Sequence, residues 1–261
     1  MKFGRFTYNN SIYNGVFEED VITIIDGNPL TEWSYTDQKV SINDVEFLAP
    51  LTPRNVIGIG ANYVGDKDSL PDEIPEMPVF FLKPATSVIG PNEAVIIPDQ
   101  LQEVKFESEL AVVIGKEAKN IEKEKALEYV FGYTVGNDVT APQYFHNDGH
   151  WTLGKSFDTF TPLGPVIETE LDPYHIHVTA TVNGEQKQNS PTKWMIVPIK
   201  EMIAYLSTVM TLHPGDVILT GSPTGAHFVK NDDIITCSIK EIGSLTNTFS
   251  RQSSHIGVTQ Q

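Results

Sequence analysis

Glu107-Ser108-Glu109-Leu110-Ala111-Val112-Val113-Ile114-Gly115 contains two carboxylates followed by an uninterrupted apolar run. Side chains alternate along a strand, so Glu107 and Glu109 are expected on one face, roughly 7 Å apart. The following residues are apolar on both faces, which predicts a buried strand. Two carboxylates at the start of this strand would repel each other and be costly to desolvate. A bound divalent cation would compensate their negative charge and offset both costs. The alternative is an exposed strand edge with two solvated glutamates.

A third acidic residue, Asp138, follows the apolar-flanked strand candidate Gly132-Tyr133-Thr134-Val135-Gly136-Asn137. An aspartate at the end of a buried strand is a plausible third ligand, although from these residues alone an ordinary turn aspartate is the favoured interpretation. Ligand sets made only of oxygen select Mg²⁺, Mn²⁺ or Ca²⁺ over zinc.

Short β segments surround these residues, and two segments have helical periodicity. Apolar residues spaced three and four apart predict helices over 121–130 and 197–210. Many short strands with two helices predict an α+β, β-dominated fold. Further strands are expected at 54–59, 79–83, 87–89, 94–97, 106–115, 131–139, 175–183, 216–220, 234–239 and 243–249.

The first 50 residues are expected to form a small β-rich N-terminal domain, with strands at 2–8, 11–17 and 21–25. The two prolines in 48–53 end it, and 51–261 form the larger domain, with a frayed tail from residue 251. Residues 62–78 hold five acids and three prolines without helical or strand period. A loop of this length is either a lid over a site or a solvated excursion.

The composition excludes several classes of protein. With 34 acidic against 18 basic residues, the net charge of −16 and the absence of a basic cluster make a nucleic-acid surface unlikely. An anion site would need local positive charge from a metal or particular lysines. The single cysteine, Cys237, and the absence of a transmembrane segment or signal peptide predict a cytoplasmic protein with no membrane partner.

Two further stretches have the composition of ligand sites. Lys155 lies among aromatic and apolar residues, where it is either a carboxylate or oxyanion ligand or a snorkelling side chain. The stretch 214–225 runs from a strand into a loop dense in hydroxyls and backbone amides, which either cradles an anion or forms a structural turn.

In this order, these pieces resemble the fumarylacetoacetate hydrolase family from Pro53 to about Phe249. Seven motifs in register carry the resemblance. They are Gly60-Ala61-Asn62-Tyr63, Phe81-Leu82-Lys83-Pro84, Glu107-Ser108-Glu109-Leu110, Asn137-Asp138, Lys155-Ser156-Phe157-Asp158, Asn183-Gly184-Glu185, and Pro214-Gly215-Asp216 to Pro223, in which Ser222 replaces the usual threonine.

The resemblance implies a mixed β-sheet roll, a homodimer and Mg²⁺ or Mn²⁺ held by three carboxylates, which map onto Glu107, Glu109 and Asp138. It implies a small 2-oxo acid as substrate and points to the branch of 2-hydroxyhepta-2,4-diene-1,7-dioate isomerases and acylpyruvases, with a place in aromatic catabolism. The expected reactions on 2-oxo (di)carboxylic acids are isomerisation, decarboxylation or C–C hydrolysis, each through a metal-stabilised enolate. The implied catalytic residues are Lys155, Asp66 and Lys83, and the implied substrate-binding residues are Tyr63, Lys155, Thr220 and Gly221.

The sequence departs from the family at the proton-transfer positions. Hydrolase-type members carry a histidine and a glutamate where this chain has Asp66 and Ser69, and an arginine where it has Pro142. Two interpretations follow: either Asp66, or His146 or His150 from the loop 143–151, replaces the base, or the reaction is an isomerisation or decarboxylation that needs only a proton shuttle. C–C hydrolysis is the least supported reaction, because it needs an activated water. The alternative function is a metal- and ligand-binding protein with little or no catalysis.

Overall fold

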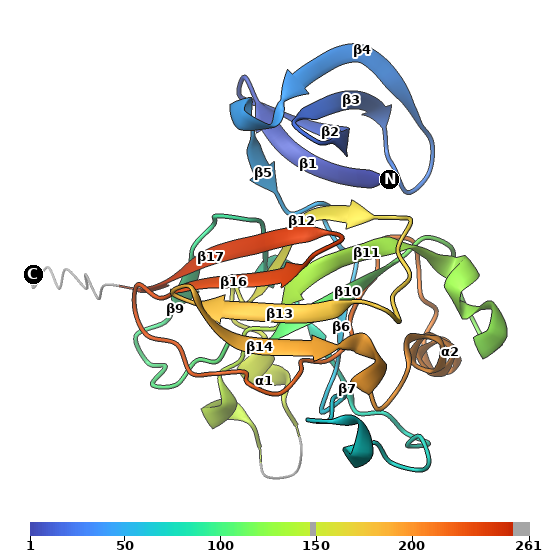
Figure 1. Cartoon of the computed structure of the whole chain (residues 1–261), viewed down its shortest axis with the longest axis vertical. Coiled ribbons are helices and arrows are strands. Elements are labelled where there is room, and N and C mark those ends of the chain that lie inside the picture. The colour runs from blue at the N-terminus through green and yellow to red at the C-terminus, as the bar shows by residue number, and fades with distance from the viewer. Residues whose placement is uncertain (147–149, 253–261) are drawn as a thin grey trace, which may run out of the picture.

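The structure, a computed structural model, describes residues 1–146 and 150–252, and strands dominate it (Figure 1). The expected β-dominated α+β fold is confirmed. The strands are β1 (Lys2–Tyr8), β2 (Ser11–Glu18), β3 (Val21–Gly27), β4 (Trp33–Ser41), β5 (Glu46–Leu48), β6 (Val56–Ile59), β7 (Phe80–Lys83), β8 (Val88–Ile89), β9 (Val95–Ile97), β10 (Ser108–Ile114), β11 (Val130–Asn137), β12 (Thr161–Glu168), β13 (His177–Val182), β14 (Glu185–Pro191), β15 (Val217–Leu219), β16 (Ile234–Ile239) and β17 (Gly243–Arg251). The α-helices are α1 (Thr152–Lys155) and α2 (Ile199–Val209), and the 3-10 helices are η1 (Ile42–Asp44), η2 (Lys67–Ser69), η3 (Ala85–Ser87), η4 (Lys123–Tyr129), η5 (Pro142–Tyr144) and η6 (Thr192–Trp194).

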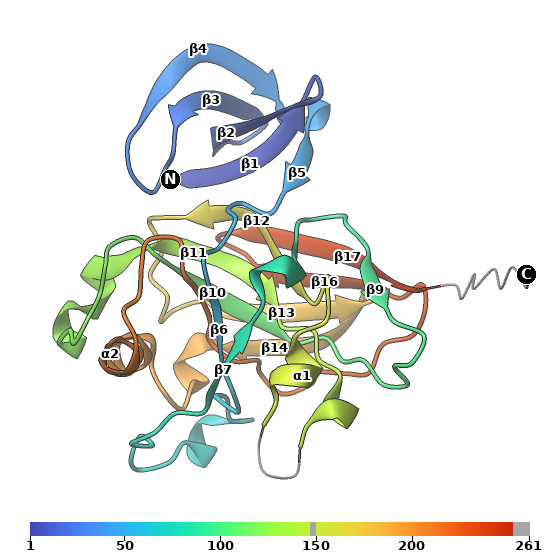
Figure 2. The same cartoon turned by 180° about the vertical axis from the view of Figure 1, so that it is seen from behind.

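Two mixed sheets form the described structure. The larger sheet runs in the order β4-β3-β2-β1-β12-β11-β10-β15-β6-β7, with β5 and β8 attached to it through β1 and β12. It is antiparallel apart from the parallel pairs β15–β6 and β12–β8. The second sheet runs β14-β13-β16-β17-β9 and lies across β10, β11 and β12 in both views (Figures 1 and 2).

The N-terminal strands continue the larger sheet, because β1 pairs antiparallel with β12 through Lys2–Glu168 and Phe3–Ile167. In Figures 1 and 2, β1 to β4 curl above the remainder of the molecule. Phe3, Val16 and Ile25 form a small apolar cluster of their own there. The division of the chain at residue 50 stays a prediction.

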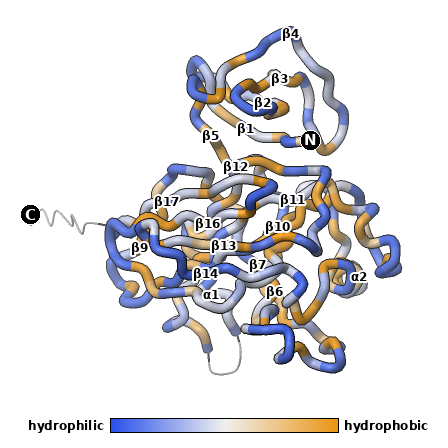
Figure 3. Tube along the Cα trace, in the orientation of Figure 1, coloured by the Kyte–Doolittle hydropathy of each residue, from blue (hydrophilic) through white to orange (hydrophobic). Residues whose placement is uncertain are grey.

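The core between the two sheets is built on β10, whose seven residues are all buried. Its neighbour β11 is buried from Gly132 onward, and α2 covers one end of the core with Ile199, Met202 and Leu206. Figure 3 shows a hydrophobic stretch along β10, whereas hydrophilic residues gather in the peripheral loops. A strand buried on both faces needs near-continuous apolar sequence, as β10 has.

Some predicted elements differ from the structure. The helix expected over 121–130 is the 3-10 helix η4, in which only Ala126 is buried, so little packing favours a longer α-helix. The strand β4 was not expected, because it is an edge strand with mostly exposed residues and no apolar alternation. The strand β12 was also missed, since Pro162 and Pro165 argue against a strand in sequence.

The tail beyond residue 252 and residues 147–149 lie outside the described residues. In the described part of the chain, none of the helices has the length and apolar character needed to cross a bilayer.

Candidate functional site

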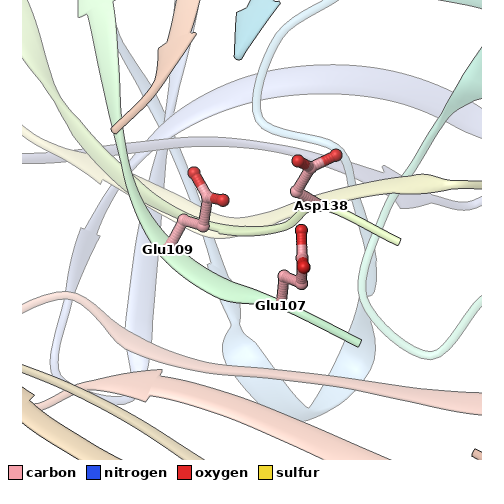
Figure 4. A group of neighbouring side chains, drawn as sticks. All are labelled: Glu107, Glu109 and Asp138. Carbon is pink, nitrogen blue, oxygen red and sulfur yellow. The ribbon is translucent and has the colours of Figure 1, made fainter. Parts of the chain in front are cut away.

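The pairing of β10 with β11 brings the three predicted acids together. Their antiparallel register places Ser108 opposite Asn137 and Glu109 opposite Gly136, so the residues flanking these strand ends become neighbours. The Asp138 amide donates a hydrogen bond to the Glu107 carbonyl, 2.8 Å away. One carboxylate oxygen from each of Glu107, Glu109 and Asp138 lies within 4.8 Å of the others, and the three side chains converge in Figure 4. These residues are called the carboxylate cluster below.

Glu109 is the most deeply buried glutamate of this cluster, and it has no salt bridge to a lysine among the described residues. Its Oε2 atom accepts a hydrogen bond from the Gly221 amide at 2.7 Å. Burial, followed by the negative charges of Asp138 and Glu107, raises the pKa of Glu109 well above its ordinary value. A positive ion close to this carboxylate would therefore be strongly favoured.

Asp138 lies between two lysines. Its Oδ1 accepts a hydrogen bond from Lys83 Nζ at 2.6 Å, and its Oδ2 forms a short contact with Lys155 Nζ. Burial disfavours the charged form of Asp138, but the two ammonium groups outweigh it and lower the pKa of this carboxyl. Asp138 is thus held ionised.

Lys155 joins Asp138 to Glu107. It ends α1, and its Nζ atom lies 2.7 Å from Glu107 Oε2 and 4.7 Å from the centroid of the Phe81 ring. Burial favours its neutral form, yet Asp138 and Glu107 together raise the pKa of the Lys155 ammonium. Lys155 therefore stays a cation inside the site.

A cavity of about 270 Å³ opens onto the cluster and Lys155. One wall is aromatic, with Phe145 stacked on Trp151 at 5.3 Å between ring centroids and an interplanar angle of 13°. Gly60 allows this packing, because a Cβ there would meet the Trp151 ring at 2.0 Å. The lining residues are Ile59, Gly60, Ala61, Phe81, Lys105, Glu107, Glu109, Asp138, Phe145, Trp151, Lys155 and Ser222.

Lys105 and the aromatic wall were missed by sequence reasoning. Lys105 precedes Glu107 and Glu109 at spacings of two and four, so strand alternation alone would have placed it on their face. Its Nζ atom lies 3.0 Å from Glu107 Oε1. No comparable pattern marks Phe145 and Trp151, which face each other across a loop.

Three predicted ligand-contacting residues lie behind the cavity rather than among its described lining residues. Lys83 is fully enclosed, and it donates to Asp138 and to the Val139 carbonyl. Thr220 directs both its amide and its hydroxyl at the Leu110 carbonyl. The Gly221 amide is occupied by Glu109.

Tyr63 is likewise absent from the described lining of the cavity. Its hydroxyl is buried with no hydrogen-bond partner among the described residues. Burial, and then the charge of Glu109, raise the pKa of this hydroxyl. An orphaned buried hydroxyl close to Glu109 is a free donor beside the cluster.

The candidate bases lie outside the cavity. Asp66 is exposed and caps η2, where its Oδ1 accepts hydrogen bonds from both the amide and the hydroxyl of Ser69, each 2.9 Å long. His146 and His150 are exposed, and the His146 amide donates to the His150 carbonyl. The described lining residues include Phe145 and Trp151, which flank these histidines, but neither histidine.

The acidic loop 62–78 borders a groove beside α2 in this structure. Ile74, Pro75 and Pro78 line a groove with Tyr205 of α2 and its neighbours. The described lining of the cavity includes Gly60 and Ala61 but none of residues 62–78. A lid role for this loop stays a prediction.

The donor chemistry of the carboxylate cluster fits a hard divalent cation. All donors are carboxylate oxygens, which suit Mg²⁺, Ca²⁺ and Mn²⁺. Each oxygen has more than one lone-pair site, so Asp138 can keep its lysines and still offer an oxygen. Glu109 is buried and has no lysine partner among the described residues, so a bound cation would compensate its negative charge.

Formal charges at the site balance without a metal. Counted with every group ionised, Lys83, Lys105 and Lys155 balance the three carboxylates, so the formal charges of the six groups sum to zero. A divalent ion would leave two positive charges. A dianionic ligand would then restore neutrality, even though the chain as a whole has a net charge of −16.

Comparison with known proteins identifies families and relatives that this chain resembles. Residues 55–250 match the family model "Fumarylacetoacetate (FAA) hydrolase C-terminal", and residues 1–50 match "Rv2993c-like, N-terminal". The chain is 42% identical over 221 residues to the mitochondrial oxaloacetate tautomerase fahd2 of Xenopus laevis, covering 80% of this chain and 69% of the relative.

Solved structures agree with these matches. A 5-carboxymethyl-2-hydroxymuconate delta-isomerase from Mycobacterium smegmatis superposes with a TM-score of 0.90 and 38% identity, covering 97% of this chain and 100% of the other. Maleylpyruvate hydrolase from Sphingobium sp. SYK-6, solved in complex with manganese (II) ion and pyruvate, gives a TM-score of 0.79 at 28% identity, covering 96% and 99%.

Proposed function

This chain belongs to the fumarylacetoacetate hydrolase family, and on that premise we propose that it is a divalent-metal-dependent enzyme that interconverts keto and enol forms of 2-oxo dicarboxylic acids. The observation that carries the proposal is the convergence of the carboxylate cluster on Lys155 at one cavity. Relatives named as a tautomerase and an isomerase of oxo acids support this reaction class.

In this proposal, Glu107, Glu109 and Asp138 hold Mg²⁺ or Mn²⁺. Held by these residues, the ion would supply positive charge to stabilise negative charge on the 2-oxo oxygen. Gly221 orients Glu109 through its amide, and Lys83 orients Asp138 from behind. Both residues thus act as positioning residues for the ligands.

Lys155 supplies the second positive group. Its raised pKa keeps it protonated at neutral pH, so it donates hydrogen bonds rather than accepting a proton. We assign it the role of binding the substrate carboxylate or the developing oxyanion, which is strongest in a site closed to water. The flat wall of Phe145 and Trp151 suits a planar enol.

None of the candidate bases for proton transfer to carbon is among the described lining residues of the cavity. Asp66 and Ser69, at the positions of the histidine and glutamate of hydrolase-type members, bond to each other outside the described cavity lining. Keto–enol exchange needs a proton shuttle, which a cavity water can provide, whereas C–C hydrolysis needs an activated water. Tautomerisation and isomerisation are therefore favoured over hydrolysis.

The direct test follows the loss of the oxaloacetate enol by ultraviolet absorbance. We expect Mg²⁺ or Mn²⁺ to support turnover, and a chelator to abolish it. Glu109→Gln should lose activity while remaining folded. The matched control is Glu122→Gln, which changes an exposed glutamate immediately before η4 and should keep full activity. Acylpyruvates and pyruvate release report hydrolysis and decarboxylation in parallel. Chelator-resistant turnover, or a fully active Glu109→Gln protein, would refute the metal role.

A ligand-binding protein without turnover is the second candidate, favoured by the engaged Asp66–Ser69 pair. The double variant Asp66→His with Ser69→Glu restores the residue types of hydrolase-type members. Turnover that appears only in this variant would identify the natural protein as a binder. Turnover in the wild-type protein would eliminate this candidate.

A further inference from the structure

Lys105 is the half-exposed cation at the cavity, and the function proposed above does not use it. Its side chain is 32% exposed, against 4% for Lys155, so Lys105 lies toward solvent and Lys155 in the interior. Both lysines bond to Glu107, Lys105 at Oε1 and Lys155 at Oε2. Glu107 thus separates an inner from an outer ammonium group.

The backbone holds Lys105 firmly in this place. Its amide donates to the Thr140 carbonyl at 2.8 Å, and the Thr140 amide returns a bond to the Lys105 carbonyl at 3.0 Å. The Thr140 hydroxyl in turn donates to Glu107 Oε2 at 3.1 Å. This reciprocal pair of backbone bonds fixes the position from which the side chain starts, and the 3.0 Å contact with Glu107 Oε1 holds the ammonium group at the cavity.

Lys105 has unused hydrogen-bonding capacity. An ammonium group has three donors, and Glu107 is the one carboxylate paired with Lys105 among the described residues. The inner lysine differs, because Glu107 and Asp138 both occupy it. A second anionic group entering the cavity would therefore find its free donors at Lys105.

We propose that Lys105 is a specificity-determining residue, which binds the carboxylate remote from the 2-oxo group and so selects 2-oxo dicarboxylates over 2-oxo monocarboxylates. The inference rests on the proposed function, in which the 2-oxo acid end lies at the carboxylate cluster. It agrees with the charge balance, since a dianion neutralises the metal-loaded site. The aromatic wall lies along the same cavity and provides no competing cation.

Isothermal titration of the Mn²⁺-loaded protein with two unreactive 2-oxo acid mimics tests this inference. Oxamate has one carboxylate, and N-oxalylglycine has a second, remote one. We expect Lys105→Gln to weaken N-oxalylglycine binding by about ten- to hundredfold, the usual effect of losing a hydrogen bond to a charged group, and to leave oxamate binding within about twofold. Lys105→Arg should retain most of the preference. Lys116→Gln, which removes an exposed lysine just beyond β10, should change neither.

The outcomes separate this inference from the proposed function. If Lys105→Gln weakens the binding of both mimics equally, or changes the binding of neither, the specificity role is overturned even if the enzyme turns over oxaloacetate. If Lys105→Gln weakens only N-oxalylglycine binding, and the wild-type protein turns over no 2-oxo acid, the specificity role of Lys105 is supported and the proposed reaction is contradicted. If neither mimic binds the Mn²⁺-loaded wild-type protein, both proposals fail.

Discussion

The carboxylate of Asp66 accepts two hydrogen bonds from Ser69, one from its amide and one from its hydroxyl, and both are 2.9 Å long. By the family resemblance, these are the positions at which hydrolase-type members are expected to carry histidine and glutamate. Here they close a single exposed 3-10 turn. The pair is thus engaged in local capping at the surface and is not placed to activate a water molecule in the cavity.

Replacing Asp66 by asparagine separates capping from catalysis. Asparagine caps helices about as well as aspartate, so we expect stability to change by less than about 0.5 kcal/mol. Because Asp66 is exposed and outside the described cavity lining, we expect tautomerase turnover to stay within about threefold of wild type. Enzyme kinetics and thermal denaturation check both. A large loss of kcat in a protein of unchanged stability would restore Asp66 as the base.

Removing Lys155 should have opposite effects on metal binding and on turnover. Lys155→Met deletes a positive charge that shares Glu107 and Asp138 with the cation, so we expect tighter Mn²⁺ binding. Turnover should fall by about 10² to 10³, the range for a lost oxyanion donor. Calorimetric Mn²⁺ titration and the enol assay measure the two effects.

The matched control for this change is Lys119→Met, an exposed lysine that bonds only to the Thr208 carbonyl among the described contacts. It should alter neither quantity. The prediction is contradicted if Lys155→Met binds Mn²⁺ more weakly than wild type while remaining folded, because Lys155 would then be a structural part of the metal site.

Gly221 should be intolerant of a side chain. Its φ of +97° disfavours other residues, and an added Cβ would lie 2.6 Å from Asn62 Cβ. Gly221→Ala must therefore shift the amide that holds Glu109. We expect a loss of stability of more than about 1 kcal/mol and at least tenfold weaker Mn²⁺ binding.

Gly184→Ala is the control for backbone strain alone, since its φ is +83° and nothing lies within 4 Å of the added Cβ. It should lower the melting temperature without affecting Mn²⁺ affinity. Equal losses of Mn²⁺ affinity in the two variants would show that the Gly221 contact to Glu109 is irrelevant.

The stability of the metal-free protein should fall as pH rises because of Glu109. Its pKa is raised above the ordinary value of 4.5, so above pH 4.5 the folded state holds a proton that the unfolded state has released. Folding is therefore favoured most below that value, and this contribution declines up to the raised native pKa. Glu109→Gln should flatten the dependence in denaturation measured with a chelator. A wild-type slope that persists in the variant would assign the effect to other groups.

Much of this site was predictable from sequence because it depends on strand alternation and strand ends. Glu107 and Glu109 flank a strand whose apolar run marks it as buried, and Asp138 directly follows its partner β11. Their convergence then requires only antiparallel pairing in the observed register.

Other parts depend on tertiary contacts that no local pattern encodes. Lys83 and Thr220 are polar residues in family-like motifs, but packing places them behind the cluster, where backbone carbonyls take up their donors. The strand β12 contains prolines that argue against a strand, and its pairing with β1 and β11 overrides them. Local sequence cannot distinguish a motif residue that touches ligand from one that supports another motif residue.

An anomalous difference map from crystals soaked in Mn²⁺ would locate the cation directly. We expect one strong peak within coordination distance of oxygens from Glu107, Glu109 and Asp138. A peak elsewhere, or no peak with Lys155 still bonded to Glu107 and Asp138, would contradict this expectation.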